Sequence, residues 1–384
     1  MKHNAKNILH VVNIYFVIPY FLGNQLDYFK QKGYREHVIC SPSGELAGYA
    51  QKHGFEYEEV PINRSISLLE DLKALWRTIR YIRRKEIGIV TGHTPKGGII
   101  AMTAAWLCRV PKRIYFRHGL VYETQHGLKR KLLITIDRIA SAFATQIVCV
   151  SESVRRRSIE DRLGAASKQL ILNQGSCTGI DTVRFDAGGI DGQRLNKLRE
   201  RLGLSRDDMV VGFTGRLVRD KGIIELVEAF KALKADVPRL KLLLVGMFEQ
   251  RDALPGDLVK QISDDADIIH TGYVDYNEIE YYYSLMDIYV LPSYREGFPV
   301  SVIEAAAMGL PVVTTKATGC IDSIIDGETG LFVDHTAQSL SNAIKRLLQD
   351  PALREKLGRQ ARENARKNFD ERTVWQYIEK LYNN

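Results

Sequence analysis

Short runs rich in β-branched and other apolar residues recur along the whole chain, and longer stretches with helical spacing separate them. This alternation is typical of βαβ units, in which helices connect parallel strands. Strand candidates in the first half are residues 8–12, 37–40, 87–91, 113–116, 146–150 and 169–172. A second series comprises residues 209–213, 241–245, 268–270, 288–291, 312–315 and 331–333. The two series predict an α/β protein with two Rossmann-like domains, each built on a parallel sheet.

The length of 384 residues favours the same division, because a single hydrophobic core rarely serves more than about 250–300 residues. The composition changes near residue 186, where glycines precede a strongly charged stretch. We expect an N-terminal domain over 1–186, a linker and a leading helix over 187–206, and a C-terminal domain over 207–368. Residues 369–384 have apolar side chains at helical spacing, and we expect this last helix to pack back on the N-terminal domain.

Cysteine usage and the start of the chain indicate the cellular compartment. The five cysteines are scattered without CxxC spacing, which argues against a disulfide framework and against structural zinc and favours a reducing cytosol. The apolar stretch 8–22 is interrupted by Asn13 and Pro19, is shorter than the roughly 20 residues of a membrane span, and lacks the layout of a signal peptide. It reads as a first strand followed by an apolar loop.

Positive charge is concentrated in the first half of the chain. Residues 1–186 contain 28 lysines and arginines against 16 aspartates and glutamates, whereas the remaining residues contain 26 against 30. The excess predicts an acidic partner for the first half. Nucleic acid is one such partner, but no helix-turn-helix, RRM or zinc signature supports it, so we expect none.

Glu296 and Glu304 flank the most informative segment. Apart from Ser301, Glu304 is the only polar side chain in the otherwise apolar stretch 300–309, and a carboxylate buried in a core helix needs hydrogen-bond donors. A sugar diol can supply them. Pro299 suits the first turn of a helix, and the Gly297 turn before it leaves backbone N–H groups and Glu296 facing the helix N-terminus. The segment predicts a nucleotide-sugar pocket; the alternative is an ion-paired core Glu304 with Glu296 as an ordinary loop residue.

Arg216 and Lys221 follow the first strand candidate of the second domain. Ligands of doubly wound sheets bind at the carboxyl ends of strands, so these cations should emerge near Glu296 and Glu304. Together they can neutralise the charge of a departing nucleoside diphosphate. The alternative is two surface cations in a connecting loop.

Gly-Arg-Leu-x-x-x-Lys-Gly at 215–222, followed in the same half by Glu-Gly-Phe-Pro-x-x-x-x-Glu-Ala at 296–305, resembles glycosyltransferase family 4. These are retaining enzymes of GT-B fold, in which two Rossmann-like domains face each other across a cleft. The resemblance covers nearly the whole chain. Residues 91–98, 117–120, 127–131 and 150–153 look like the branch that builds bacterial capsule, exopolysaccharide and O-antigen units.

The resemblance implies roles for individual residues. Arg216 and Lys221 would hold the donor diphosphate, and Glu296 would bind hydroxyls of the donor sugar. Glu304 would bind the ribose, and the backbone near Gly272 and Tyr273 would meet the base. The implied donor site is completed by Gly297, Phe298 and Pro299.

His118 would face the reacting sugar, which makes it a catalytic candidate with Arg216, Lys221 and Glu296. Independently, a histidine at a strand end followed by Gly119 permits close approach of the backbone to a ligand. The alternative is a structural histidine.

The family is thought to react by front-face attack, with the leaving phosphate oxygen as base, and the sequence offers no second carboxylate for double displacement. We expect no cofactor and no metal, because two side-chain cations take the metal's place. Asp265-Ala266-Asp267 resembles a DxD metal motif but is expected on an exposed turn before a strand.

The acceptor is expected at the first domain. Arg64, His93, Lys96 and the turn at Gly97 have the cations and N–H groups that bind a phosphorylated acceptor, although solvated loops are the alternative. Residues 127–143 and the loop 14–22 combine basic and apolar side chains, which favours docking on an anionic membrane surface. A core helix with a charged face is the alternative for 127–143.

These observations predict a cytoplasmic glycosyltransferase, peripheral on the inner face of the membrane. It would transfer a hexosyl or N-acetylhexosaminyl group from a nucleotide sugar, UDP-linked, to a polyprenyl-diphosphate-linked saccharide in the synthesis of capsule or lipopolysaccharide. The alternative is a UDP-sugar epimerase or hydrolase of the same fold, which would release UDP without an acceptor.

Overall fold

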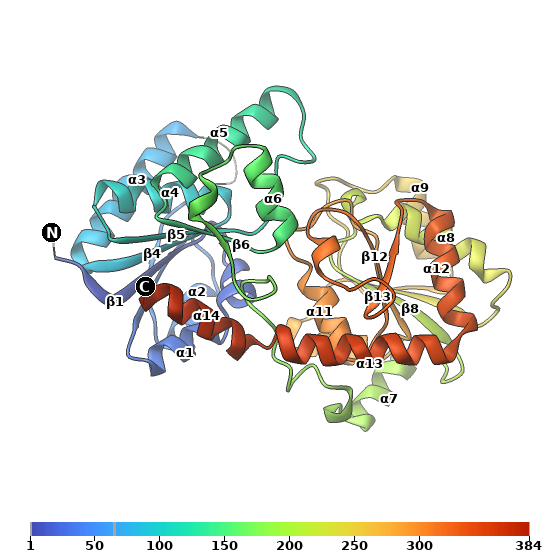
Figure 1. The fold of residues 1–384 in the computed structure, drawn as a ribbon. Coiled ribbons are helices and arrows are strands. Elements are labelled where there is room, and N and C mark those ends of the chain that lie inside the picture. Colours follow the sequence, from blue (N-terminus) through green and yellow to red (C-terminus); the bar gives the residue numbers. More distant parts are fainter. Residues whose placement is uncertain (1, 64–66, 384) are drawn as a thin grey trace. The chain divides into compact units, whose positions relative to one another are not determined.

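The computed structural model describes residues 2–63 and 67–383, which form two compact units. The first unit runs to Thr178 and also includes the chain from Arg372 onward, and the second is Gly179–Glu371 (Figure 1). Each unit is a parallel β-sheet covered by helices, so the predicted fold class, two Rossmann-like domains, is confirmed.

The sheet of the first unit has seven parallel strands in the order β3-β2-β1-β4-β5-β6-β7. Their bounds are β1 Asn4–Val11, β2 Arg35–Cys40, β3 Glu56–Glu59, β4 Ile87–His93, β5 Lys112–Arg117, β6 Gln146–Cys149 and β7 Gln169–Ile171. The strand order reverses between β1 and β4, and in such sheets ligands bind outside the carboxyl ends at this switch point. His93 ends β4 and Arg117 ends β5, next to this position.

Helices cover both faces of this sheet. Their bounds are α1 Gln25–Gln31, α2 Leu46–His53, α3 Leu68–Arg84, α4 Pro95–Leu107, α5 Gly127–Phe143, α6 Glu152–Glu160 and α14 Glu371–Asn383. α4 packs between α3 and α5 on one face, and α1, α2 and α14 lie on the other (Figure 1). α14 is attached to α1 through a hydrogen bond from the Tyr28 hydroxyl to Glu379 (2.8 Å) and through ring contact between Phe29 and Tyr382.

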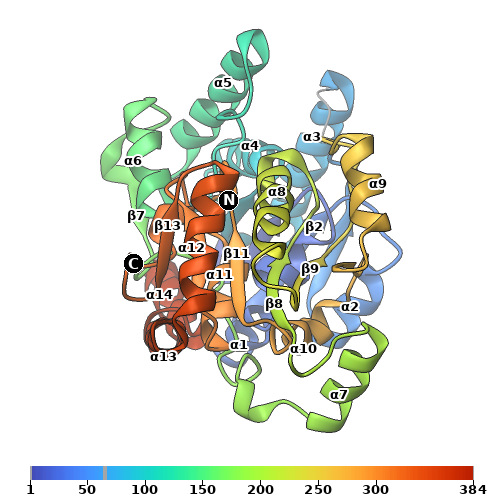
Figure 2. The same ribbon diagram turned by 90° about the vertical axis from the view of Figure 1, so that its right-hand side faces the viewer.

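The sheet of the second unit has six parallel strands in the order β10-β9-β8-β11-β12-β13, with its switch point between β8 and β11. The strands are β8 Met209–Thr214, β9 Leu240–Val245, β10 Ile268–His270, β11 Ile288–Leu291, β12 Val312–Thr315 and β13 Gly330–Val333. The helices are α7 Gly192–Arg201, α8 Ile223–Lys234, α9 Gly256–Asp264, α10 Ile279–Tyr283, α11 Val300–Ala307, α12 Ala337–Gln349 and α13 Pro351–Asn368. α8 and α12 lie side by side on one face (Figure 2), and α11 packs against α13.

All twelve strand candidates correspond to strands in the structure, and β3 is the strand that the sequence did not predict. Its sequence, Glu56-Tyr57-Glu58-Glu59, has no apolar alternation because it is an edge strand, where charged side chains are common.

The apolar loop 14–22 contains one π-helical turn, Ile18–Leu22. Val17, Ile18 and Leu22 are buried in a core cluster formed with side chains of α1, α2 and β2, whereas Phe16 is 61% exposed. Most of the loop's apolar side chains are therefore core, which corrects the expectation that they are free to meet a membrane. None of the helices in the described ranges combines the length and apolar character of a membrane span.

Candidate active site

Two loops meet at the switch point of the second sheet: residues 215–222 after β8 and residues 292–299 after β11. Gly222 has a φ of 70°, and a Cβ there would lie 2.3 Å from the carbonyl oxygen of Pro292. Only glycine permits both this backbone conformation and this approach. The contact brings the loop with Lys221 against the loop with Glu296.

Lys221 and Glu296 form an ion pair in which both side chains are mostly buried. Ser293 also donates a hydrogen bond to Glu296 Oε1 (2.9 Å), and the backbone N–H of Glu296 donates to the carbonyl of Thr318 (2.9 Å). A carboxylate fixed by a cation, a hydroxyl and its own backbone is well oriented for a polar ligand. Two residues that the sequence assigned to one site therefore touch each other.

Glu304 lies on α11 and is 4% exposed. Tyr276 donates to its Oε1 and Tyr283 to its Oε2, both at 2.8 Å, and burial raises the pKa of the carboxyl. The prediction that this carboxylate is buried with donors waiting is confirmed. The sequence did not identify the donors, because both tyrosines belong to other elements, α10 and the turn before it.

Thr214, at the end of β8, extends this network. Its hydroxyl lies 2.8 Å from the hydroxyl of Tyr283 and 3.0 Å from that of Tyr289. Because Tyr283 uses its proton for Glu304, its oxygen accepts from Thr214. The carboxylate is thereby tied to the central strand of the sheet.

Arg216 is half exposed, and its Nη1 lies 3.0 Å from Glu249 Oε2. An isolated bridge between the backbones of Leu217 and Phe248 holds the loop after β8 against the loop after β9. Glu249 was not singled out in the sequence, and no spacing to Arg216 indicates the pair.

The remaining predicted donor residues lie around the same edge. Gly272 forms an antiparallel bridge with Gly246, and the side chain of Tyr273 is 70% exposed. Phe298 is buried with its ring against Phe369, centroids 5.3 Å apart, so its side chain is part of the core. Pro299 is the N-cap of α11, one position before the predicted first turn.

In the first unit, His118 follows β5, and its Nε2 lies 3.0 Å from His93 Nδ1. Its Nδ1 lies 3.3 Å from the Cys177 sulfur, and the ring of Phe21 packs on it at 4.0 Å between centroids. Burial lowers the pKa of His118 to about 3 and holds the pKa of His93 well below its usual value. Both imidazoles are therefore neutral at physiological pH.

The other predicted acceptor residues are already engaged. Lys96 forms an ion pair with Asp71, and the N–H of Gly97 donates to Thr94 Oγ1 (3.3 Å) at the start of α4. Arg64 lies outside the described residues. The structure brings His93 and His118 together and pairs Lys96 with a carboxylate that the sequence analysis did not consider.

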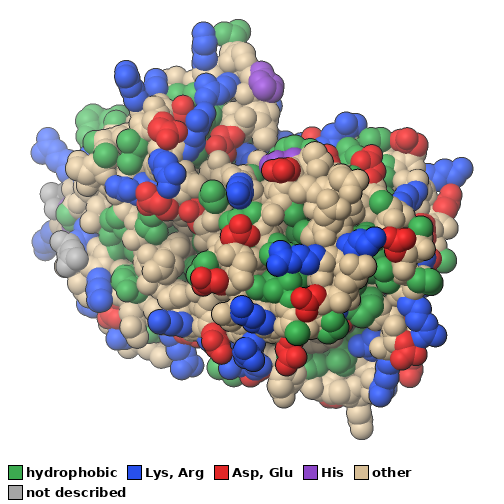
Figure 3. Space-filling model, turned by 45° about the vertical axis from the view of Figure 1, so that its right-hand side comes forward, with side chains coloured by type: hydrophobic (Ala, Val, Ile, Leu, Met, Phe, Trp, Pro, Cys, Tyr) green, Lys and Arg blue, Asp and Glu red, His purple; other side chains and the backbone are tan. Residues whose placement is uncertain are grey.

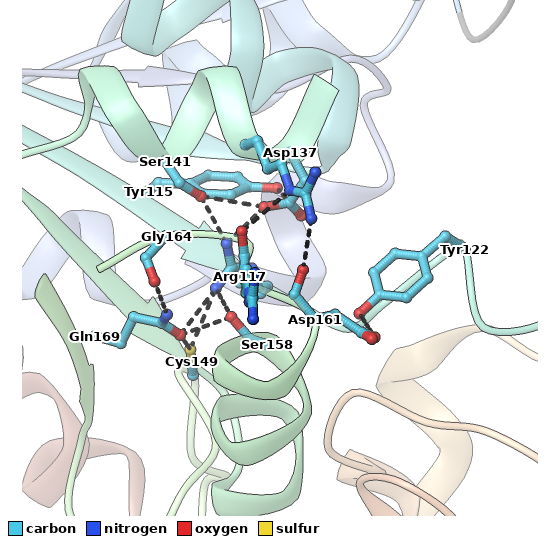
Figure 4. Close-up of polar contacts among 12 residues, drawn as sticks. Tyr115, Arg117, Tyr122, Asp137, Ser141, Cys149, Ser158, Asp161, Gly164 and Gln169 are labelled. Carbon is cyan, nitrogen blue, oxygen red and sulfur yellow. Dashed lines mark hydrogen bonds and ion pairs between the residues drawn. The ribbon is translucent and has the colours of Figure 1, made fainter. Parts of the chain in front are cut away.

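Arg117, directly before His118, is fully buried. Its Nη2 donates to Asp137 (2.5 Å) and Ser141 (2.7 Å) of α5, and its Nη1 donates to Ser158 (2.5 Å) of α6 and Gln169 (3.1 Å) of β7 (Figure 4). The guanidinium therefore joins the end of β5, one residue before His118, to three neighbouring elements. A basic residue closing an apolar strand was the only sequence signal for it.

Asp267 of the DxD-like segment is bound by Lys234 (2.5 Å) and Lys241 (2.6 Å), and these ammonium groups lower the pKa of its carboxyl. These two ion pairs give Asp267 a structural role. In the described part of the chain, no cluster of three or more histidine, cysteine or acidic residues has metal-site geometry.

Comparison with known proteins identifies the family of this chain. Residues 196–364 match the family model of glycosyl transferases group 1, and residues 8–151 match that of glycosyl transferase 4-like proteins. Together with these matches, the fold defines a glycosyltransferase of the GT-B class. The capsular polysaccharide biosynthesis glycosyltransferase CapM of Staphylococcus aureus is 32% identical over 380 residues, which is 98% of this chain and 97% of that protein. The chain belongs to the glycosyl transferases of group 1.

More distant similarities agree with this assignment. A UDP-Gal:alpha-D-GlcNAc-diphosphoundecaprenol alpha-1,3-galactosyltransferase of Escherichia coli is 25% identical over 321 residues, 83% of this chain and 81% of that protein. The crystal structure of Anabaena HepE in complex with UDP-glucose has a TM-score of 0.80 at 21% identity and covers 98% of this chain and 100% of its own. The similarity to HepE shows a shared fold.

Proposed function

We propose that the protein is a retaining hexosyl- or N-acetylhexosaminyltransferase that uses a UDP-sugar and extends a polyprenyl-diphosphate-linked saccharide in bacterial surface polysaccharide synthesis. Two observations at the carboxyl end of the second sheet carry the proposal. Lys221 and Glu296 form an ion pair, and Glu304 is buried with hydrogen bonds from two tyrosines. The pair supplies a cation for a diphosphate and a carboxylate for sugar hydroxyls, and Glu304 supplies an acceptor for a ribose diol.

The donor would bind at the carboxyl ends of β8 and β11. Lys221 and Arg216 hold the diphosphate, Glu296 and the backbone of 297–299 orient the sugar, and the base lies near Gly272 and Tyr273. Named relatives support UDP as the nucleotide, since the Escherichia coli enzyme uses UDP-Gal and HepE was crystallised with UDP-glucose.

The named acceptors of two relatives are lipid-linked. The Escherichia coli enzyme acts on a diphosphoundecaprenol sugar, and so does an N-acetylgalactosaminyltransferase of Campylobacter jejuni that is 25% identical over 338 residues. The acceptor of this chain would lie against the first unit, near His93, His118 and Lys96; the predicted acceptor residue Arg64 lies outside the described residues. For Lys96 to bind a phosphate, it must exchange its partner Asp71 for the ligand.

In the reaction, the bond between the sugar's anomeric carbon and the diphosphate breaks, and the acceptor hydroxyl forms the new bond on the same face. The departing phosphate oxygen takes the hydroxyl proton. The residues contribute charge and alignment: Lys221 and Arg216 stabilise the negative charge that develops on the diphosphate, and Glu296 fixes the sugar. This scheme needs no metal.

Two exposed helix faces favour peripheral docking on an anionic membrane from the cytoplasmic side. α5 begins with exposed Leu128 and Leu132 beside Lys129 and Lys131, and basic and hydrophobic side chains occur together where the start of this helix projects (Figure 3). The first turns of α3 expose Leu68, Leu69, Leu72 and Trp76, with the Arg80 guanidinium over the Trp76 ring. Apolar side chains beside cations suit a lipid interface.

The test is a transfer assay with UDP- and GDP-sugars and undecaprenyl-diphosphate-linked saccharides, with NMR of the product's anomeric configuration. We expect transfer with retention, and no UDP release without acceptor. Rapid UDP release or epimerisation without acceptor would instead support the alternative hydrolase or epimerase. Inversion of configuration would overturn the retaining assignment.

A further inference from the structure

A continuous chain of hydrogen bonds links Glu36 to His118 inside the first unit. The successive contacts are Glu36 Oε2 to His10 Nε2 (2.8 Å), His10 Nδ1 to Thr91 Oγ1 (2.7 Å), Thr91 Oγ1 to His93 Nε2 (3.1 Å), and His93 Nδ1 to His118 Nε2 (3.0 Å). The first four residues are buried, and Thr91 and His10 are fully inaccessible. Buried polar chains of this kind are costly unless every member is satisfied.

Strand register explains why these side chains meet. His10 of β1 lies opposite Thr91 of β4, and His93 lies two positions further along β4, so Thr91 and His93 project from the same face. Glu36 of β2 is two positions before Val38, the register partner of His10, and therefore also shares a face with it. The chain crosses three adjacent strands and reaches the loop after the fourth.

With a neutral His10, the direction of every hydrogen bond follows from the first group. As a carboxylate, Glu36 can only accept, so the neutral His10 carries its proton on Nε2 and accepts on Nδ1. Thr91 then donates to His10 and accepts from His93 Nε2–H. His93, being neutral, accepts on Nδ1 from His118 Nε2–H. The Nδ1 of His118 is left with a lone pair, which faces the Cys177 thiol, a weak donor.

We propose that Glu36, His10, Thr91 and His93 are positioning residues that hold His118 in the Nε2–H tautomer, with Nδ1 presented as an acceptor for a hydroxyl or amide N–H of the reacting sugars. A sugar hydroxyl is a stronger donor than the Cys177 thiol and can take its place. The inference rests on the proposed function, in which His118 faces the reaction. The group that His118 binds through Nδ1 is therefore a hydrogen-bond donor.

Substitutions of Thr91 can distinguish a role in this hydrogen-bond chain, which we call the relay, from a role in packing. Thr91→Val keeps the branched shape but removes the hydroxyl that both donates and accepts, whereas Thr91→Ser keeps the hydroxyl and removes a methyl group. A packing role predicts that serine is the worse replacement. The relay predicts the opposite order.

The experiment compares the two variants by transfer kinetics and by ¹⁵N NMR of labelled histidines, with His118 assigned from a His118→Gln spectrum. We expect Thr91→Val to lower kcat about tenfold, to leave the UDP-induced thermal shift unchanged, and to give His118 a mixture of tautomers. Thr91→Ser should keep wild-type kcat and the Nε2–H signal. If Thr91→Val does not fold, Glu36→Gln takes its place, since an amide can either donate or accept and leaves the direction of the chain undetermined.

The outcomes separate this inference from the proposed function. Wild-type turnover in Thr91→Val, equal loss in both variants, or an unchanged His118 tautomer would overturn the relay. A wild-type protein that transfers no sugar to any lipid-linked acceptor would overturn the proposed function, while the NMR comparison still decides whether the chain sets the tautomer.

Discussion

Tyr276 and Tyr283 each donate a hydrogen bond of 2.8 Å to Glu304, but Tyr283 is fully buried whereas Tyr276 is 40% exposed. The Tyr283 bond is fixed by the core, and its oxygen is held in turn by Thr214. The Tyr276 bond comes from a side chain that is partly open to solvent. In the proposed donor complex, a ribose hydroxyl would replace Tyr276, while Tyr283 keeps the carboxylate oriented.

Replacing Glu304 should separate ligand binding from stability. Glu304→Gln removes a carboxylate whose burial raises its pKa, so it should abolish the UDP-induced rise in Tm while leaving the Tm of the free protein equal or higher. Differential scanning fluorimetry with and without UDP measures both effects. Glu355→Gln, an exposed position on α13, is the matched control. A full UDP shift in Glu304→Gln would remove this residue from the nucleotide site.

The ion pair of Lys221 and Glu296 should act as a unit. Lys221→Ala and Glu296→Ala should each reduce kcat about a hundredfold with little change in Tm, and the double variant should be little worse than either one. Steady-state transfer kinetics measure this, with Lys231→Ala, an exposed cation on α8, as control. Additive losses would mean that the two side chains contribute independently.

The buried Arg117 network should matter for stability. Asp137→Asn leaves the guanidinium without its counter-charge and should destabilise the first unit by about 3–5 kcal/mol, measured by urea unfolding. Arg117→Lys should also destabilise, because an ammonium cannot reproduce the planar fork. Lys131→Ala, exposed on the same helix as Asp137, should change stability by less than about 0.5 kcal/mol. Wild-type stability in Asp137→Asn would contradict this account.

Three histidines with lowered pKa values should make the protein sensitive to acid. Burial lowers the pKa of His37 to about 4 and of His118 to about 3, and it also lowers that of His93. Below about pH 6.5 the unfolded state binds protons that the folded state does not, so the free energy of unfolding falls with pH until each folded pKa is reached. Each group contributes a slope of about 1.4 kcal/mol per pH unit.

His37→Phe tests this slope directly, because it removes one of the three groups. Urea unfolding between pH 6.5 and 4.5 should give a slope smaller by about 1.4 kcal/mol per pH unit than in the wild type. The Tyr81 hydroxyl lies 3.0 Å from His37 Nδ1 in the wild type, so the variant leaves this hydroxyl unpaired. That loss lowers the free energy of unfolding at every pH without changing the slope. An unchanged slope would show that His37 takes up its proton in the folded state.

Membrane docking should depend on the exposed face of α3. Leu72→Gln combined with Trp76→Gln should reduce binding to vesicles that contain anionic lipid, measured by co-sedimentation, and binding of the wild type should weaken with salt. Val183→Ser, which changes an exposed apolar residue of the second unit, is the control. Equal binding to neutral vesicles, or no effect of the double variant, would count against this face.

The fold could be predicted from the sequence because strand periodicity is a local signal. Buried parallel strands are continuous apolar runs, and the twelve that were recognised include the core of both sheets, whereas the charged edge strand β3 was missed. The apolar loop 14–22 was predicted to dock on a membrane, but most of its apolar side chains are in the core. Apolar side chains in a loop indicate burial, but not whether core or membrane covers them.

The sequence by itself determined the two-sheet architecture, the buried carboxylate of Glu304 and the loops that carry Lys221 and Glu296, because these depend on residue type at short spacing. Only the tertiary structure decided which side chains complete them. Tyr276 and Tyr283 reach Glu304, and Asp71 pairs with Lys96, across separations that no local pattern records. The chain from Glu36 to His118 likewise exists only because strand register stacks side chains from three strands on one face, and register is fixed by the packing of the whole sheet.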